Sequence, residues 1–304
     1  MIKNNPLVSI CCITYNHFNF IIDALEGFLR QKTDFNFEIC LGEDESNDGT
    51  REICQEYAEK YPDKIRLFLR SRKDVIYVCG RATGQFNLIE TLNKCDGKYI
   101  ALCEGDDYWT DPYKLQKQVD FMEANKNASL CYHKVIRPGI KIDEANFLIK
   151  NDLSTSFIPT CSILFINKKE IVNKFINHSK GIISGDQFLF YLCSFIGEIK
   201  FMDFIGGVYN QTENGISRSI GIRSKKWRLN RILMYSRLLR FAPLKNKVKL
   251  IKIAQGSLFN AMTHGIMKPF MTYPYHVFKI IILGLIFHPK YTLFRGKSLI
   301  NKTG

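Results

Sequence analysis

Residues 98–109 read KYIALCEGDDYW, in which an apolar run ends at a cluster of acidic residues. The first six residues, Lys98 to Cys103, form a short apolar run that predicts a buried strand. The run stops at Glu104, and Asp106 and Asp107 follow directly. In sheets of parallel strands, ligands bind beyond the carboxyl ends of the strands. We therefore expect an acidic ligand site at the end of this strand.

The same pattern recurs on both sides of this stretch. Apolar runs of strand length alternate with segments whose apolar residues recur at helical spacing. This alternation predicts an α/β domain with a mostly parallel central sheet flanked by helices. The expected strands are Leu7–Thr14, Phe37–Leu41, Ile65–Leu69 and Lys98–Cys103, and the expected helices are Phe20–Gln31, Thr50–Tyr61, Thr83–Lys94 and Lys114–Asn125.

Polar residues follow two more of these strands. Thr14 and Tyr15 end the first strand, and Glu43 and Asp44 follow the second. Because the carboxyl ends of parallel strands meet at one edge of a sheet, we expect these residues to converge with the acidic stretch 104–107.

Carboxylates packed as tightly as Glu104, Asp106 and Asp107 repel one another unless a cation lies between them. Mg²⁺ and Mn²⁺ take oxygen ligands of this kind, usually with substrate phosphates. Gly105 is expected to leave room for a ligand to approach the backbone. The alternative is a solvated loop that caps the next helix, but Asp111 before Pro112 already has the sequence of a helix start.

Composition limits the classes of protein that remain. The chain has 304 residues, of which 46% are hydrophobic and 24% charged, as in ordinary globular proteins. Its ten cysteines are scattered and none lies in a CxxC pair. This spacing excludes a secreted disulfide scaffold, makes a zinc site improbable and predicts buried, reduced thiols.

Charge is distributed very unevenly. Residues 214–304 contain 18 Lys and Arg but no Asp or Glu, whereas residues 1–213 carry a net charge of −4. Within 244–262, the apolar residues share one helix face opposite Lys245, Lys249 and Lys252, a pattern typical of helices on an anionic membrane surface. A helical bundle that buries the apolar face is the main alternative. We expect no nucleic-acid partner, because no binding motif is present.

Four segments together resemble family 2 glycosyltransferases, an inverting family with the Rossmann-like GT-A fold. They span roughly residues 6–215, and their order and spacing make the resemblance specific. The resemblance implies a GT-A domain over residues 1–215 and a basic helical extension over residues 216–304. The four segments are LVSICCITYNH (Leu7–His17), EDESNDGT (Glu43–Thr50), KYIALCEGDDYW (Lys98–Trp109) and SGDQFL (Ser184–Leu189).

The resemblance also implies roles for single residues. Thr14 and Tyr15 in the first turn, and the acidic pair Glu43 and Asp44, would hold the base of a nucleotide-sugar. Glu43 stands where the family usually has Asp.

In the family's DxD-like motif, Glu104 and Asp106 would contact the donor, and Asp106 or Asp107 would bind Mn²⁺ or Mg²⁺. The register leaves the main metal ligand open between these two aspartates. Many relatives carry a Tyr-Arg pair and a His near the end of the domain, and residues 209–212 lack both the Arg and the His.

Asp186 corresponds to the catalytic base, and the alternative is a simple helix N-cap. Trp109 either stacks on the acceptor sugar or plugs the hydrophobic core beneath the loop.

The implied reaction is inverting transfer from a nucleotide-sugar, with UDP-sugars favoured, to a saccharide or lipid-linked saccharide in cell-surface polysaccharide synthesis. The alternative is a non-catalytic membrane-surface scaffold on a decayed transferase fold. Residues 1–6 lack the apolar segment of a signal peptide, and the apolar run Ile280–Phe287 is short. We therefore expect a cytoplasmic protein, peripheral at the inner membrane face.

Overall fold

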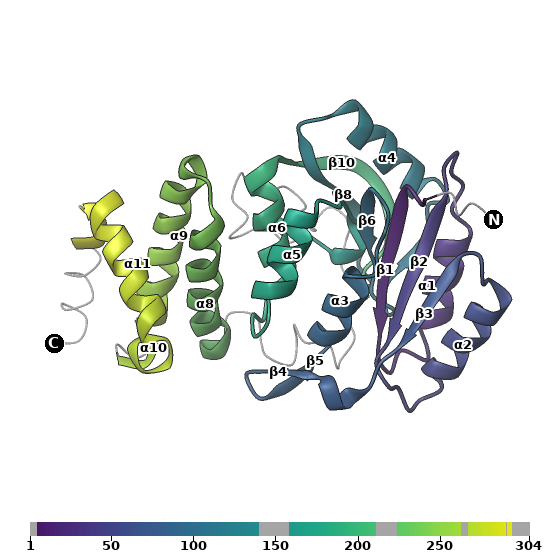
Figure 1. Cartoon of the computed structure of the whole chain (residues 1–304), viewed down its shortest axis with the longest axis horizontal. Helices are drawn as coiled ribbons and strands as arrows, with labels where there is room; N and C mark the ends of the chain where they lie inside the picture. The colour runs from purple at the N-terminus through teal and green to yellow at the C-terminus, as the bar shows by residue number, and fades with distance from the viewer. Residues whose placement is uncertain (1–4, 140–157, 211–223, 263–266, 290, 294–304) are drawn as a thin grey trace. The chain divides into compact units, whose positions relative to one another are not determined.

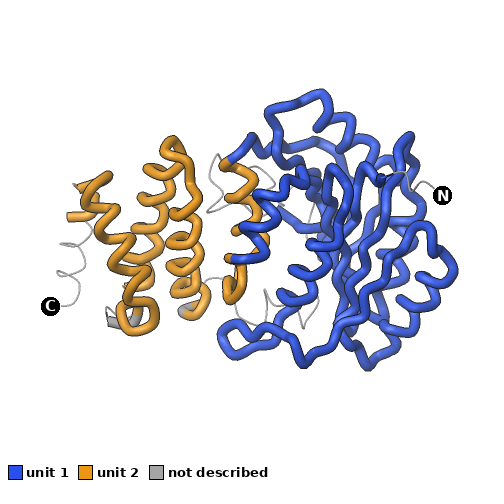
Figure 2. The backbone as a smooth tube through the Cα atoms, in the orientation of Figure 1, with its two compact units in different colours: residues 1–177, 196–212 blue, residues 178–195, 213–304 orange. Residues whose placement is uncertain are grey.

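The computed structural model describes residues 5–139, 158–210, 224–262, 267–289 and 291–293. The chain divides into two compact units, residues 1–177 with 196–212 and residues 178–195 with 213–304 (Figure 2). Residues 178–195 therefore group with the C-terminal helices. The domain boundary expected near residue 215 stays a prediction.

The first unit is built on a mixed, mostly parallel sheet (Figure 1). Within the described residues, its strand order is β3-β2-β1-β6-β9-β8-β10-β7. The β3/β2, β2/β1, β1/β6 and β8/β10 pairs are parallel, whereas β9 and β7 run antiparallel to their neighbours. The bounds are β1 Val8–Thr14, β2 Phe37–Glu43, β3 Ile65–Leu69, β6 Tyr99–Leu102, β7 Tyr108–Trp109, β8 Ala128–Ile136, β9 Ile163–Ile166 and β10 Glu198–Val208, with a separate hairpin of β4 Ile76–Val78 and β5 Arg81–Thr83.

Helices flank this sheet and bury its central strands. Helix α3 packs on β1 and β2, α2 packs on β3, and α4 packs on β8. Strand β1 is buried at almost every position, which is why its sequence is a continuous apolar run rather than an alternating one. The helix bounds are α1 Ile21–Leu29, α2 Thr50–Lys60, α3 Gln85–Leu92, α4 Lys114–Ala124 and α5 Lys169–His178, with short 3₁₀ turns η1 Arg72–Asp74 and η3 Thr160–Ser162.

The expected strands and helices agree with this fold to within about two residues at most ends. The helix start expected at Asp111 and Pro112 is an exception. The helix begins at Lys114, and the Asp111 carboxylate instead accepts the N–H of Tyr113 at 2.9 Å. Asp111 therefore closes a turn before the helix and does not cap its first turn.

The second unit is helical. Its elements are α6 Gly185–Ile196, whose last residue falls in the first unit, α8 Lys225–Phe241, α9 Leu244–Met262, α10 Met267–Thr272 and α11 Pro274–Phe287. Among the described residues, no helix combines the length and apolar content needed to cross a membrane.

Helix α9 corrects the expectation of a membrane-facing amphipathic helix. Ile251, Ala254 and Leu258 are fully buried, and α9 packs against both α8 and α11. Only the first turns of its apolar face, at Leu244 and Val248, are exposed. The bundle alternative therefore accounts for most of the apolar face of α9.

Candidate functional site

The carboxyl ends of β1, β2 and β6 bring the predicted polar residues to one edge of the sheet. Thr14 pairs with Glu43 in the β1/β2 register, and the Asp44 N–H donates to the Thr14 carbonyl at 3.1 Å. On the other side of β1, the Gly105 N–H donates to the Ile13 carbonyl at 2.9 Å. The expected convergence is therefore present in the first unit.

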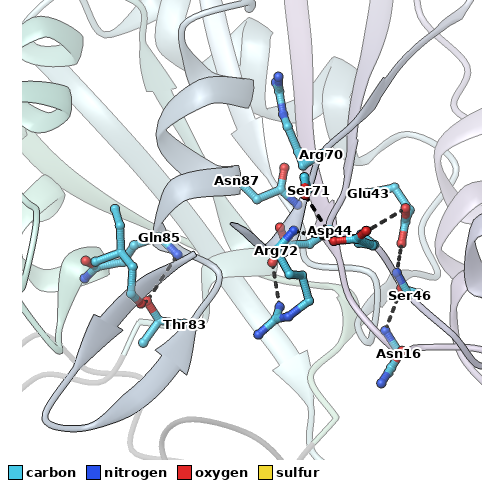
Figure 3. A network of polar contacts seen from close by, with 12 residues as sticks. Asn16, Glu43, Asp44, Ser46, Arg70, Ser71, Arg72, Thr83, Gln85 and Asn87 are labelled. Carbon is cyan, nitrogen blue, oxygen red and sulfur yellow. Dashed lines mark hydrogen bonds and ion pairs between the residues drawn. The ribbon is translucent and has the colours of Figure 1, made fainter. Parts of the chain in front are cut away.

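A left-handed residue lets the chain turn at the end of β1. Asn16 has a φ of 52°, a conformation that asparagine tolerates better than most residues. Its N–H donates to the Ser46 hydroxyl at 2.9 Å (Figure 3). Its side-chain oxygen accepts the Asn47 N–H at 3.1 Å. These bonds fix the turn after β1 to the loop after β2.

Glu43 is fully buried and already has partners. It forms an ion pair with Arg51, and it accepts the backbone N–H groups of Glu45 at 3.2 Å and Ser46 at 2.7 Å. Arg51 in turn donates to the Arg70 carbonyl at 2.8 Å. Glu43 therefore fixes the conformation of the loop that follows β2, and both of its carboxylate oxygens are in use, unlike those of Asp44.

Asp44 has one oxygen in use and one without a partner. Oδ2 lies 2.8 Å from Nη1 of Arg72 (Figure 3), whereas buried Oδ1 has no hydrogen-bond partner among the residues that the structure describes. Burial raises the pKa of Asp44 to about 6, and the charge of Arg72 opposes this rise. An unpaired buried acceptor is costly unless a ligand satisfies it.

Arg72 also lies over the ring of Tyr15, with its guanidinium carbon 3.8 Å from the ring centroid. Tyr15 and Asp44 are therefore bridged by one planar, hydrogen-bond-donating group. A nucleobase has the same two properties, a flat face and N–H donors. Sequence reasoning missed Arg72, because it belongs to no recognised motif and only its place after the third strand could have indicated it.

The acidic stretch divides into carboxylates with different surroundings. Glu104 is exposed, Asp106 is half-buried and Asp107 is buried. Asp107 accepts the backbone N–H of Asn210 at 2.8 Å, and the Asn210 side chain donates to the Asp106 carbonyl at 2.7 Å. Burial raises the pKa of Asp107 well above its usual value, and the negative charges of Asp106 and Glu104 raise it further.

Asn210 lies within the stretch that lacks the family's Arg and His. Asn210 binds the acidic turn through its backbone N–H and its side-chain amide. Gln211 and Thr212, named in the same expectation, lie outside the described residues.

A divalent cation suits this pair of aspartates. Its charge would relieve the repulsion that raises the pKa of Asp107, and carboxylate oxygens are suitable donors. Among the described residues, no three His, Cys, Asp or Glu side chains are grouped to hold a metal ion. Such a cation would therefore need further ligands from a bound diphosphate, as Mg²⁺ sites commonly do.

His17 lies beside this pair, with Nε2 3.9 Å from Oδ2 of Asp106. Burial lowers the pKa of His17, and the charge of Asp106 opposes that shift.

Gly105 does not leave an open approach to the backbone, contrary to expectation. A Cβ at this position would lie 2.6 Å from Oγ1 and 2.8 Å from Cβ of Thr14. Glycine is needed here because β1 and the acidic turn pack closely.

Trp109 is buried, and its position favours a role in the hydrophobic core beneath the loop over a contact with the acceptor sugar. Its indole N–H donates to the Cys161 carbonyl at 2.8 Å, and its ring meets Phe28 edge to face at 4.8 Å. The buried amine of Lys114 lies 3.6 Å from its ring centroid. With no exposed surface, the ring cannot stack on a sugar in this structure.

Asp186 belongs to the second unit, in the first turn of α6. Burial raises its pKa, while the Gln187 N–H and the charge of Arg231 oppose that rise. A carboxylate with a raised pKa at a helix N-terminus suits a general base.

Helix α8 holds the segment that presents Asp186. The Asn230 side chain accepts the Ile183 N–H and donates to the Gly181 carbonyl, both at 2.7 Å. The Trp227 indole N–H donates to the Ser184 hydroxyl at 3.2 Å. Sequence reasoning assigned no role to these α8 residues, because their partners lie about 45 residues away and no local pattern links them.

Comparison with known proteins identifies the first unit. The model of the family described as Glycosyl transferase family 2 matches residues 9–145. This range includes the turn after β1, the loop after β2 and the acidic stretch.

Two relatives illustrate how far the similarity extends. An uncharacterized protein of Mycobacterium tuberculosis is 32% identical over 222 residues, which cover 70% of this chain and 61% of the relative. The match thus spans less than two thirds of that protein. TuaG of Bacillus subtilis, named as a candidate teichuronic acid biosynthesis glycosyltransferase, is 32% identical over 117 residues, 38% of this chain and 42% of TuaG.

Two solved structures share the fold. Staphylococcus aureus TarS 1–349 in complex with UDP-GlcNAc has a TM-score of 0.61 at 16% identity, over 88% of this chain and 75% of that one. The mannosyltransferase PcManGT from Pyrobaculum calidifontis, in complex with GDP-Man and Mn²⁺, has a TM-score of 0.55 at 15% identity, over 97% and 85%. The matched residues 9–145 therefore belong to glycosyl transferase family 2, and the sheet architecture shared with these two structures is the GT-A fold.

Proposed function

We propose that this protein is an inverting glycosyltransferase that moves a sugar from a nucleotide-sugar to a saccharide or lipid-linked saccharide. The observation that carries the proposal is the convergence of Tyr15, Asp44 and Asp106 at one sheet edge, with Asp44 Oδ1 unpartnered. The family match supports the reaction class.

In this proposal the donor base lies at Tyr15 and Asp44. The base packs beside Tyr15 and the Arg72 guanidinium that lies over its ring, and it donates an N–H to Asp44 Oδ1, which removes the cost of an unpaired buried oxygen. Thr14 and Glu43 hold the two turns that present these residues. UDP-sugars are the favoured donors, which the UDP-GlcNAc complex of TarS supports.

Asp106 and Asp107 would hold Mn²⁺ or Mg²⁺ together with the donor diphosphate, and Glu104 would contact the donor beside them. The Mn²⁺ complex of PcManGT supports a metal in this fold. When bound, the cation neutralises charge on the leaving diphosphate. Asn210 keeps both aspartates in place through its bonds to the acidic turn.

Asp186 is the proposed general base. Its carboxylate accepts the proton of the acceptor hydroxyl as that oxygen attacks the anomeric carbon from the face opposite the leaving group. One displacement inverts the anomeric centre and needs no covalent enzyme intermediate.

We place the reaction in the synthesis of a cell-surface polysaccharide, at the cytoplasmic face of the membrane. The similarity to TuaG, named for teichuronic acid biosynthesis, supports a polysaccharide pathway. The basic residues of 214–304 support a peripheral location on an anionic membrane.

Thermal unfolding with nucleotides tests the donor site. A ligand that binds only the folded state raises the melting temperature. We expect UDP or a UDP-sugar with Mn²⁺ to raise it, and inorganic diphosphate with Mn²⁺ to raise it less, because only the nucleotide fills the Asp44 side of the site. Asp186→Asn should keep this shift and lose sugar transfer. A wild-type protein that binds no nucleotide would instead be a membrane-surface scaffold on a transferase fold.

A further inference from the structure

Helix α11 presents an apolar stripe to solvent. Four side chains on one face are exposed to 70% at Tyr275, 55% at Phe278, 54% at Ile282 and 64% at Ile286. Their spacing of three and four residues places them along one side of the helix. Soluble proteins rarely expose contiguous apolar surface of this kind unless it binds something.

The opposite face of α11 is fixed within the bundle. Val277 and Ile280 are fully buried, and α11 packs against α8 and α9. At Gly284 the approach is so close that a Cβ would lie 1.8 Å from the Gln255 side chain. These contacts fix the rotation of α11 about its own axis. The apolar stripe on the opposite face therefore points to solvent.

Basic residues of α9 lie beside the end of this stripe. His288, directly after α11, forms a 2.9 Å hydrogen bond between Nε2 and the Val248 carbonyl, which brings the first half of α9 next to the end of α11. Lys245, Lys249 and Lys252 are exposed in that half of α9, and Lys252 lies 5.6 Å from the Tyr291 ring centroid. No Asp or Glu occurs in residues 214–304 to offset these charges.

We propose that the α11 stripe is a membrane-docking surface that lies flat on a bilayer containing anionic phospholipid. Phe278, Ile282 and Ile286 enter the boundary between head groups and acyl chains, Tyr275 lies at the interface, and the lysines of α9 bind the lipid phosphates. The inference rests on the membrane association proposed above and names its surface and lipid chemistry. Fourteen residues make a helix about 21 Å long, shorter than the hydrocarbon core and suited to lying in the interface.

This assignment differs from the one that the sequence favours. The apolar face of α9 is used inside the bundle, so α9 supplies charge while α11 supplies apolar contact. A partner that presents only phosphates, such as double-stranded nucleic acid, would use the lysines but would gain nothing from the Phe278 and Ile282 side chains.

Flotation of the 304-residue chain with lipid vesicles tests the proposal. We expect binding to phosphatidylcholine vesicles that contain phosphatidylglycerol, and much weaker binding to phosphatidylcholine alone or in high salt. The double variant Phe278→Ser, Ile282→Ser should bind at least about tenfold more weakly. The triple variant Lys245→Glu, Lys249→Glu, Lys252→Glu should bind about a hundredfold more weakly or worse.

Matched controls come from the first unit. Tyr77→Ser removes an apolar side chain that is more exposed than Phe278 or Ile282, and the triple variant Lys60→Glu, Lys126→Glu, Lys174→Glu changes the net charge by the same amount as the α9 variant. The vesicle affinity of both controls should be much closer to that of the wild type than the affinities of the α9 and α11 variants are.

Two results would overturn the proposal. One is vesicle binding that survives both sets of α9 and α11 substitutions. The other is a wild-type dimer that the Phe278 and Ile282 substitutions convert to a monomer without any vesicle binding, since the stripe would then contact a second copy. Nucleotide-induced thermal shifts on the same samples separate this outcome from failure of the proposed function, because the stripe variants should keep the wild-type donor shift.

Discussion

Nη1 of Arg231 donates to Oε1 of Gln187 at 3.0 Å, and Gln187 directly follows Asp186. Arg231 is itself buried, 4.5 Å from the Trp227 ring centroid and in contact with the Tyr235 hydroxyl. Burial raises the pKa of Asp186, and the positive charge of Arg231 opposes that rise. Helix α8 therefore helps to keep the proposed base ionised.

Replacement of Arg231 should change the pH dependence of transfer. A general base must be ionised to accept a proton, so activity falls as the pH drops through the pKa of Asp186. Because Arg231→Gln removes the charge that lowers this pKa, the acidic limb of the kcat/KM profile should move to higher pH. Turnover should therefore fall more at acidic pH than above neutral pH, where the carboxylate is ionised in both proteins.

Arg231→Lys and Arg228→Gln are the matched controls. The lysine keeps the charge and should restore the acidic limb, even if turnover stays low because the bond to Gln187 is lost. Arg228 lies on the same helix and donates to Asn260 at 3.0 Å, so its loss should leave the profile in place. An acidic limb that is the same in Arg231→Gln as in the wild type would exclude this role.

Glu43→Gln should act mainly on stability. The substitution removes a fully buried carboxylate charge, leaves the half-buried Arg51 without its partner and weakens the bonds to the loop N–H groups. Loss of one member of a buried ion pair is strongly destabilising, and we expect about 3 kcal/mol from urea unfolding.

The exposed pair of Glu170 and Lys174 provides the comparison. Surface pairs contribute little to stability, so Glu170→Gln should unfold at nearly the wild-type urea concentration. Equal midpoints for the two variants would mean that the Glu43 contacts do not stabilise the fold.

The sheet and the place of the acidic stretch follow directly from the sequence. Continuous apolar runs such as residues 7–14 are dictated by burial on both faces, and their ends are marked by residues that cannot be buried without partners. These signals are local, so each strand and the polar residues after it could be predicted one at a time.

The partners of those polar residues could not be predicted in this way. Glu43 and Asp44 are neighbours with similar side chains, yet one pairs with Arg51 and the other with Arg72. Trp109 likewise looks equally suited to a binding surface and to a core until the position of Phe28 is known. Such choices depend on contacts between distant residues, for which a single sequence gives no signal.

Gly105→Ala should disrupt the donor site through packing. The added methyl group would lie 2.6 Å from Thr14 Oγ1, so β1 or the acidic turn must shift. We expect a loss of about 1–3 kcal/mol of stability together with a smaller thermal shift by UDP and Mn²⁺. Gly256→Ala in α9, where the nearest atom is the Tyr291 hydroxyl oxygen at 3.7 Å, should be neutral or stabilising. A Gly105→Ala protein with wild-type stability and donor binding would show that this close contact can relax without consequence.

Binding of the base should weaken in acid because of Asp44. The pKa of Asp44 is raised to about 6, so the carboxylate is ionised at pH 7.5 and largely protonated at pH 5. Protonation removes the charge that accepts an N–H of the base at Oδ1. We therefore expect the Kd for uridine, measured by NMR titration, to increase severalfold between pH 7.5 and pH 5.

Uridine is the appropriate probe because it carries no phosphate, so titration of the diphosphate and of the acidic turn contributes least to its binding. Asp44→Asn should bind uridine more weakly at pH 7.5 and should lose the pH dependence, because an amide does not titrate in this range. If the wild type and Asp44→Asn share the same pH profile, another group controls the affinity and Asp44 does not contact the base. A variant with a flat profile but wild-type affinity would mean that Asp44 lies near the base without accepting its N–H.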